Sequence, residues 1–284
     1  MKKNLKIIFF GTPHFAAVVL DRLKKSGIEI ALIITAPDKP KGRKLVVTPS
    51  EVKVWAHDNE VDVLQPDDLR DEDFLEDLKN TDWDLFIVTS YGTILPKEIL
   101  DIPKYGTLNV HPSLLPKLRG ASPIISAIIR DEKKTGVSIM LVDEKMDHGP
   151  IIAQASIEIE SWPPRASLLS EMLATEGGNL LAEVIEPFVA GEITPEAQEH
   201  NEATYTEKIK KEDGLIDLSL DPHENLRKIR AFEGWPGTYF FTKKEGKEMR
   251  VKIMDARLKD AKLEITRVIP EGKREMDYED FLRG

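Results

Sequence analysis

The sequence predicts an α/β protein with a doubly wound, mostly parallel sheet, followed by a small, mostly-β domain of the partial barrel (OB-like) type. The first indication is the start of the chain, where an apolar run at 7–10, a turn at Gly11 and a helical pattern at 15–25 form a β-α-β unit. The second is the length of 284 residues with 41% hydrophobic side chains, which suits one large and one smaller domain. The third is the tail, where short strand-like runs alternate with turn residues.

The predicted elements follow this pattern along the chain. Strands are expected at 7–10, 28–35, 61–64, 85–90, 107–111, 137–142 and 151–159, and helices at about 15–25, 49–59, 71–79, 122–130 and 165–189. Thr48, Pro49, Ser50 and Glu51 form a capping box with Thr48 as the N-cap and proline at the first helical position. We expect a first domain at 1–190, a linker at 191–205, and a second domain at 206–284 with strands at 238–241, 250–256 and 263–268.

The composition excludes several kinds of site. The chain has no cysteine, which excludes disulfides, thiol nucleophiles and cysteine-bound zinc, and its six histidines fall in no metal-ligand spacing. No apolar run approaches the ~20 residues of a membrane span, and the run at 7–10 is too short for the core of a signal peptide. We therefore expect a cytoplasmic protein with no metal and no membrane partner.

The charge distribution limits any contact with nucleic acid. A formal net charge of −10 argues against a generally basic binding surface. Residues 1–205 carry 22 Lys and Arg against 33 Asp and Glu, whereas residues 206–284 carry 18 against 17. Any contact with RNA would therefore have to be local.

The strand expected at 107–111 carries two polar side chains on one face. Because successive side chains of a strand point to opposite faces, Leu108 and Val110 share one face and Asn109 and His111 share the other. Pro112 cannot donate to the sheet, so it ends the strand and leaves His111 at the carboxyl edge, where open α/β sheets bind ligands. From this strand alone, structural polar groups with satisfied hydrogen bonds are the commoner explanation.

A carboxylate further along the chain changes this balance. Asp147 lies in a loop between two apolar runs and is followed by Gly149. A carboxylate that reaches His111 and Asn109 stabilises the protonated imidazole, while the imidazolium and the amide stabilise a developing oxyanion. We therefore interpret Asn109, His111 and Asp147 as the catalytic residues.

Four short motifs occur in a fixed order. They are Asn109-x-His111-x-Ser113-Leu114-Leu115-Pro116, Arg119-Gly120-Ala121-Ser122-Pro123-Ile124, Thr135-Gly136-Val137-Ser138 and Met146-Asp147-x-Gly149. Each motif alone is weak, but the four together resemble folate-dependent formyltransferases. The motif Arg230-Ala231-Phe232-x-x-Trp235-Pro236 and the segment 270–284 are similar to the members of this family that act on initiator tRNA, so the resemblance covers essentially the whole chain.

The resemblance implies a Rossmann-like formyltransferase domain at 1–190 and a tRNA-binding type of domain at 206–284. It implies an enzyme that transfers a formyl group from 10-formyltetrahydrofolate to the amino group of methionyl initiator tRNA, with Asn109 and His111 at the oxyanion and Asp147 supporting proton transfer. We expect this enzyme to be a monomer. The core motifs are equally compatible with an N-formyltransferase that acts on a nucleotide-linked amino sugar, because that enzyme uses the same folate donor.

The resemblance also implies the binding residues. It places the tetrapeptide 113–116 against the folate, and it assigns the loops at Gln65 and Tyr91 to the walls of the pterin pocket, although Tyr91 is equally compatible with core packing. The polar loop 36–45 contains Lys41, Arg43 and Lys44, and its composition alone favours a solvated surface loop. In the family, a basic insertion at this point contacts the acceptor stem of the tRNA, and Arg43 matches it best.

Two features depart from the family pattern. Strand-length segments that the family normally carries between the equivalents of 256 and 263 are missing, so we expect an abbreviated second domain. His148 follows Asp147 where a small residue is commoner. It could tune Asp147, but a solvent-facing imidazole is the simpler interpretation.

Overall fold

The computed structural model describes residues 5–41, 45–244 and 246–283 and divides into two compact units. The first unit comprises Met1–Arg119, Gly136–Ile157 and Glu171–Thr204, and the second comprises Gly120–Thr135, Glu158–Ser170 and Tyr205–Gly284. Each unit has a hydrophobic core of its own. Whether the chain also divides into independently folding domains at the expected linker 191–205 stays a prediction.

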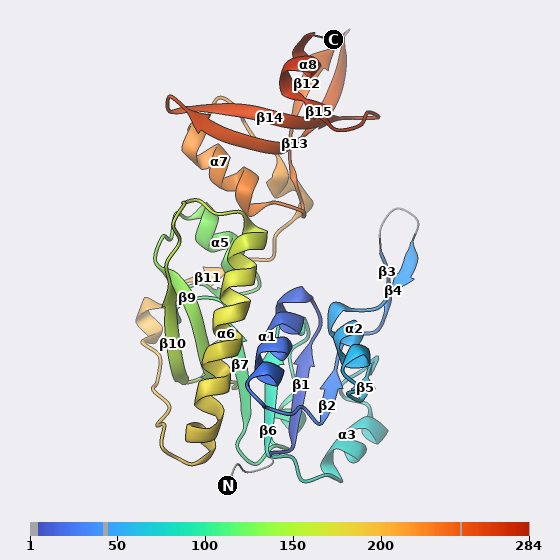
Figure 1. The fold of residues 1–284 in the computed structure, drawn as a ribbon, viewed down its shortest axis with the longest axis vertical. Helices are drawn as coiled ribbons and strands as arrows, with labels where there is room; N and C mark the ends of the chain where they lie inside the picture. Colours follow the sequence, from blue (N-terminus) through green and yellow to red (C-terminus); the bar gives the residue numbers. More distant parts are fainter. Residues whose placement is uncertain (1–4, 42–44, 245, 284) are drawn as a thin grey trace. The chain divides into compact units, whose positions relative to one another are not determined.

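The first unit is built on one large sheet. Its strands are β1 (Ile7–Gly11), β2 (Leu32–Ile34), β5 (Val63–Leu64), β6 (Leu85–Thr89), β7 (Thr107–His111), β9 (Thr135–Leu141) and β10 (Ile151–Ile157). They lie in the order β10-β9-β7-β6-β1-β2-β5 (Figure 1). β1 pairs in parallel with β2 and β6, β2 with β5, and β6 with β7, whereas β7 and β9 are antiparallel. The predicted mostly parallel sheet is therefore confirmed.

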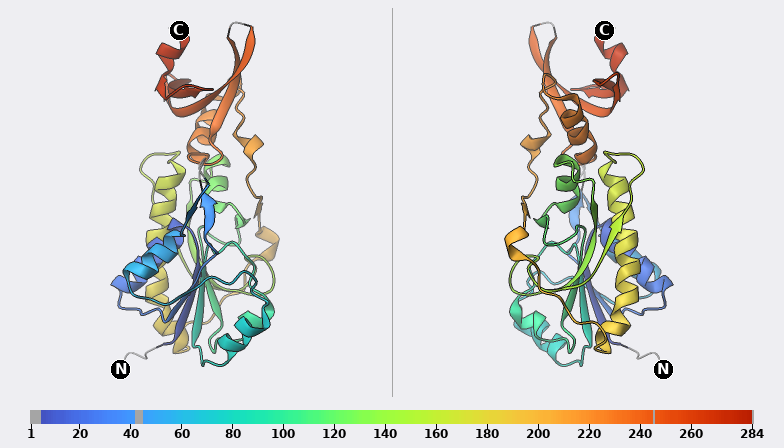
Figure 2. Two further views of the ribbon diagram at one scale, coloured as in Figure 1. Left: turned by 90° about the vertical axis from the view of Figure 1, so that its right-hand side faces the viewer. Right: turned by 90° about the vertical axis from the view of Figure 1, so that its left-hand side faces the viewer.

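Helices cover both faces of this sheet (Figure 2). They are α1 (His14–Lys25), α2 (Glu51–Asp58), α3 (Glu72–Lys79), α4 (Lys97–Leu100) and α6 (Ala166–Val189). On one face, Phe10 of β1 packs in a cluster with Leu78 of α3 and Ile99 of α4. On the other face α6 packs closely, because a Cβ on its Gly177 would lie 2.6 Å from Val110 Cγ1 of β7. In the described part of the chain, none of the helices has the length and hydropathy needed to cross a membrane.

The chain order creates a switch point between β1 and β6. The strands β1, β2 and β5 extend in one direction across the sheet, and β6 and β7 follow on the other side of β1. At such a point the connections leave toward opposite faces, and a crevice forms beyond the carboxyl ends of the strands. His111 is the last residue of β7, so it lies at this edge.

The segment 36–48 contains a hairpin, and the following helix begins later than predicted. The hairpin strands are β3 (Lys39–Lys41) and β4 (Val46–Thr48). The N-cap of α2 is Ser50, whose Oγ accepts a hydrogen bond from Lys53 N. The predicted N-cap at Thr48 is wrong because Thr48 is the last residue of β4 and is paired with Lys39.

The second unit contains an antiparallel sheet. Its strands are β12 (Thr238–Lys244), β13 (Lys247–Lys259), β14 (Lys262–Pro270) and β15 (Met276–Asp277), and its helices include α5 (Pro123–Ile129), α7 (Pro222–Ala231) and α8 (Tyr278–Arg283). The remaining short elements of the chain are β8 (Arg119–Gly120), β11 (Tyr205–Thr206) and the 3-10 turns His200–Glu202 and Lys211–Gly214. Leu226, Val251 and Phe281 belong to the core of this unit. The expected small, mostly-β second part of the chain is confirmed.

Candidate active site

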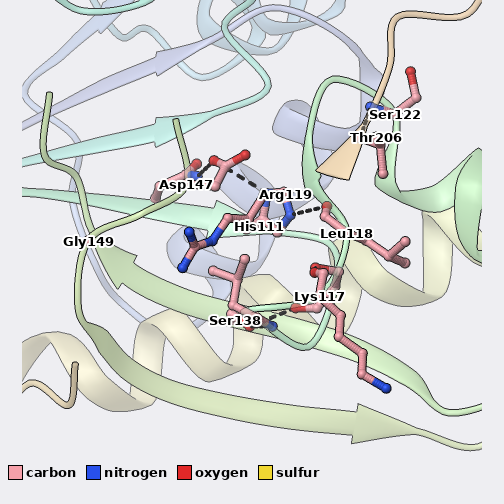
Figure 3. Close-up of polar contacts among 12 residues, drawn as sticks. His111, Lys117, Leu118, Arg119, Ser122, Ser138, Asp147, Gly149 and Thr206 are labelled. Carbon is pink, nitrogen blue, oxygen red and sulfur yellow. Dashed lines mark hydrogen bonds and ion pairs between the residues drawn. The ribbon is translucent and has the colours of Figure 1, made fainter. Parts of the chain in front are cut away.

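Asn109, His111 and Asp147 meet at the carboxyl end of β7. Asp147 Oδ1 lies 3.6 Å from His111 Nδ1 (Figure 3). The same oxygen lies 3.5 Å from Asn109 Nδ2. The side chains of His111 and Asp147 are only 5% and 15% exposed. Charges at this site therefore interact through surroundings that screen them much less than bulk water does.

The hydrogen-bond partners of His111 define where its protons lie. Nε2 is 3.0 Å from the carbonyl oxygen of Leu118. A carbonyl oxygen only accepts, so Nε2 carries a hydrogen. Nδ1 lies 3.6 Å from Asp147 Oδ1, so the second ring nitrogen faces a carboxylate. The site therefore places an imidazole beside a carboxylate, which is a pairing that general acid–base chemistry uses.

The Asp147 loop has a constrained backbone. Asp147 has a φ of 49°, in the left-handed region that costs energy for a residue with a side chain. Gly149 approaches the neighbouring chain so closely that a Cβ there would lie 2.0 Å from the carbonyl oxygen of Leu141. The tight turn and the close approach of this glycine together bring the loop back against the sheet, with the Asp147 carboxylate at the end of β7.

Ser138 of β9 supports the loop that follows β7. Its Oγ donates to the carbonyl oxygen of Ser113 at 2.6 Å and accepts from Leu115 N at 3.0 Å. Gln154 Nε2 of β10 donates to Ser138 Oγ and to the carbonyl oxygen of Leu115. Within the tetrapeptide, Ser113 and Leu115 are buried, whereas Leu114 and Pro116 are half-buried. The backbone of the tetrapeptide is thus fixed by side chains from the two strands beyond it.

A cavity of about 340 Å³ lies among the loops that follow β2, β5 and β6. Its walls include Pro37, Pro66, Tyr91 and Ile94. Tyr91 also packs edge-on against Phe10, so it belongs to the core as well as to the wall. Burial raises the pKa of Tyr91 to about 12, which keeps its hydroxyl protonated at neutral pH.

Gln65 lies behind this cavity and shapes its wall. Its Nε2 donates to the carbonyl oxygen of Ala36 and to Asp38 Oδ1, both at 2.8 Å. Asp38, which lines the cavity, also accepts from Lys53 Nζ at 2.7 Å. Hydrogen bonds from Lys53 and then from Gln65 hold the pKa of Asp38 below its usual range. Asp38 is therefore a fixed negative charge in the cavity wall.

Of the three expected tRNA contacts, Lys41 lies within the described residues. Lys41 is the last residue of β3 and pairs with Val46. Arg43 and Lys44 lie outside the described residues. The hairpin also exposes apolar side chains at Leu45, Val46 and Val47.

The comparison with known families assigns the chemistry. The family described as "Formyl transferase" matches residues 5–185. The chain belongs to the formyl transferase family. A second family, "Formyl transferase, C-terminal domain", matches residues 208–264. The chain is therefore a formyl-transferring enzyme. Asn109, His111 and Asp147 all lie in the part of the chain that the first family covers.

Individual formyl transferases resemble the chain over most of its length. "Methionyl-tRNA formyltransferase" of Bacillus licheniformis is 38% identical over 98% of this chain and 95% of the relative. The protein of the same name from Chloroflexus aurantiacus is 43% identical over 87% of this chain and 79% of the relative. The solved N-formyltransferase of Helicobacter canadensis, a complex with folinic acid and dTDP-3-aminofucose, has a TM-score of 0.65 and 19% identity, covering 90% of this chain and 88% of that one.

The structure also reveals polar contacts around the Asp147 loop that the sequence did not indicate. Gln198 is 5% exposed and donates to the carbonyl oxygen of Asp147, and Arg119 is 1% exposed and bonded to Gln198. His148, expected to face solvent, is instead half-buried, with Nδ1 2.6 Å from Asp143 Oδ2 and its ring stacked on His200. No local pattern could have identified Gln198, because it lies 51 residues from Asp147.

The described residues contain no group of three or more His, Asp or Glu side chains arranged to hold a metal ion.

Proposed function

We propose that this formyl transferase moves the formyl group of 10-formyltetrahydrofolate to the amino group of methionyl initiator tRNA. The observation that carries the proposal is the contact of Asp147 with both His111 and Asn109 at the carboxyl edge of the sheet. The acceptor is supported by the relatives named for it, which align with nearly the whole chain. A monomer as the active unit is part of the proposal.

The residues beside β7 fit a folate donor. The cavity of about 340 Å³ at the loops after β2, β5 and β6 has the size class of a small-molecule site and is large enough for a flat heterocycle. Its walls combine the ring of Tyr91 and three prolines with the carboxylate of Asp38, so they offer both an apolar surface and a hydrogen-bond acceptor. We assign Gln65 and Tyr91 to the shaping of this pocket, and the tetrapeptide 113–116 to contacts with the donor. When bound, the folate supplies the formyl group.

Asn109 and His111 stabilise the negative charge that develops on the formyl oxygen. The amide of Asn109 has two hydrogens, so it can donate one to Asp147 and present the other to that oxygen. Both ring nitrogens of His111 face protein oxygens, so protonation of the ring during the reaction would place a positive charge at a fixed, buried position. Preorganised groups of this kind typically supply ~10²–10³-fold in rate for each donor.

Asp147 holds and moves the proton. The attacking amine must lose a proton and the leaving nitrogen must gain one, so a group that accepts and returns a proton serves both needs. Asp147 Oδ1 is the acceptor, and the adjacent His111 ring stabilises its charged form. Water can complete the path between the carboxylate and the reacting nitrogens.

The basic hairpin is the proposed contact with the tRNA. We assign Arg43, Lys41 and Lys44 to the acceptor stem, because guanidinium and ammonium groups bind phosphates through charge-assisted hydrogen bonds. The otherwise acidic first part of the chain makes such a local cationic segment necessary for binding RNA.

An assay with two acceptors tests the proposal. The purified protein is mixed with 10-formyltetrahydrofolate and either methionyl initiator tRNA or a dTDP-linked amino sugar, and formylated product is measured by mass spectrometry. We expect product from the tRNA and none from the sugar. Product from the sugar alone would replace the proposed acceptor while retaining the chemistry, and no product with either would contradict the proposed function.

A further inference from the structure

Gln198 makes four hydrogen bonds in the interior of the first unit. Its Nε2 donates to the carbonyl oxygens of Asp147 at 3.0 Å and Gly149 at 2.6 Å. Its Oε1 accepts from both Nε and Nη2 of Arg119. These contacts use the two donor hydrogens and the two acceptor lone pairs of a primary amide. The orientation of the amide is fixed by chemistry, because carbonyl oxygens only accept and a guanidinium only donates.

The two carbonyl groups that Gln198 holds lie on either side of His148, in the loop that carries the Asp147 carboxylate. Asp147 occupies the left-handed region with a φ of 49°, a conformation that persists only where neighbouring groups enforce it. The Asp147 backbone is therefore held by the amide of Gln198 while its side chain lies 3.6 Å from His111.

Arg119 anchors Gln198 from behind. The guanidinium is almost fully buried, and its Nη2 also lies 3.0 Å from His200 Nδ1. The ring of His200 stacks on that of His148, with centroids 4.0 Å apart and planes 7° from parallel. His148 in turn bonds Asp143 at 2.6 Å. The Asp147 loop is thus held at its carbonyl groups by Gln198 and at its side chains by the stacked pair.

We infer that Gln198 is a positioning residue for formyl transfer, which fixes the Asp147 carboxylate against His111 through the loop backbone. The expected loss in kcat rests on the proposed function, whereas the expected displacement of Asp147 from His111 does not depend on the acceptor. A displacement of about 1 Å at a reacting group can lower the rate by about 10²-fold. Substitution of Gln198 is therefore expected to lower kcat more than it weakens the binding of either substrate.

Two substitutions separate the donor function of Gln198 from the packing of Arg119. Gln198→Glu keeps an oxygen acceptor for Arg119 but loses the hydrogens that bind the two carbonyl groups. Gln198→Met keeps the approximate volume without introducing charge. Gln154→Met is the matched control, because Gln154 also makes paired bonds but holds the tetrapeptide after β7. We expect it to raise the KM for the folate donor.

The first measurement is a double-mutant cycle. We expect each Gln198 variant to lower kcat by about 10- to 100-fold in the wild-type background, and by less than about 3-fold when Asp147→Asn is already present. Gln154→Met should change the KM for the folate donor by a similar factor in the wild-type and the Asp147→Asn backgrounds. Equal losses from the Gln198 variants in both backgrounds would overturn the inference, because Gln198 would then act independently of Asp147.

The second measurement needs no activity. Crystal structures of the wild type and of Gln198→Glu and Gln198→Met at the same pH should show Asp147 displaced from His111, with their closest atoms beyond the ~4 Å range of an ion pair. An unmoved Asp147 in both variants would overturn the inference. If the wild type formylates no acceptor, the proposed function fails, while these structures still decide the role of Gln198.

Discussion

Replacing Asp147 by asparagine removes one negative charge beside His111 while preserving the size and planarity of the side chain. Asp147 Oδ1 is 3.6 Å from His111 Nδ1 in a site where both side chains are largely buried. With an effective dielectric constant of about 20, two unit charges at that separation interact by about 5 kcal/mol. If the imidazole is protonated in the transition state and neutral in the ground state, this attraction lowers the activation free energy, and its loss lowers the rate by roughly 10³-fold.

Single-turnover formylation of methionyl initiator tRNA is the assay for this variant, because it isolates the chemical step from product release. We expect a loss of about 10³-fold in the single-turnover rate, with folate binding and the melting temperature close to the wild-type values. A loss below about 10-fold would refute the reasoning, since the charge of Asp147 would then contribute little when the imidazole is protonated.

Three further perturbations test other parts of the account. Gly149→Ala should lower the free energy of unfolding by about 1–3 kcal/mol through overpacking, because its Cβ would lie 2.0 Å from the carbonyl oxygen of Leu141; an unchanged urea midpoint would contradict this. Arg43→Ala should raise the KM for tRNA by roughly 10-fold or more through the loss of a charged hydrogen bond and leave folate binding unchanged; unaltered tRNA kinetics would remove the hairpin from recognition. Loss of hydration and then neighbouring cationic side chains hold the pKa of His200 below 6.5. The folded chain therefore binds fewer protons than the unfolded chain below that pH, and stability should fall as the pH drops from 6.5 through the lowered value. His200→Asn, which cannot titrate, should flatten this part of the curve of melting temperature against pH, and parallel curves for the two proteins would contradict the assignment.

The sequence contains enough local information to predict the sheet and the residues of the catalytic cluster, which are Asn109 and His111 on a strand and Asp147 in a loop. The apolar run of β1, its turn and α1 show the β-α-β pattern within one segment, and parallel pairing follows from the connection. Asn109 and His111 could be placed on one face because a strand alternates with a period of two. The loop position of Asp147 marks it as a candidate, and the fold brings its carboxylate to Asn109 and His111.

Other features depend on contacts between distant segments and could not be predicted. Thr48 and Ser50 both have capping side chains, and only the pairing of Thr48 with Lys39 in the hairpin decides between them. Gln198 belongs to a polar segment of the kind that usually forms a linker, yet it is buried by its bonds to Arg119 and the Asp147 loop. Side chains that satisfy backbone groups of another segment leave no periodic signal in the sequence.

The most direct test of the central claim is the rate of formyl transfer to methionyl initiator tRNA by His111→Ala, measured beside its binding of folate. The account predicts that the variant folds and binds the donor, but that its transfer rate falls by at least ~10²–10³-fold because the fixed positive charge at the oxyanion is lost. A transfer rate near that of the wild type would contradict the assignment of the cluster at the end of β7 as the catalytic site.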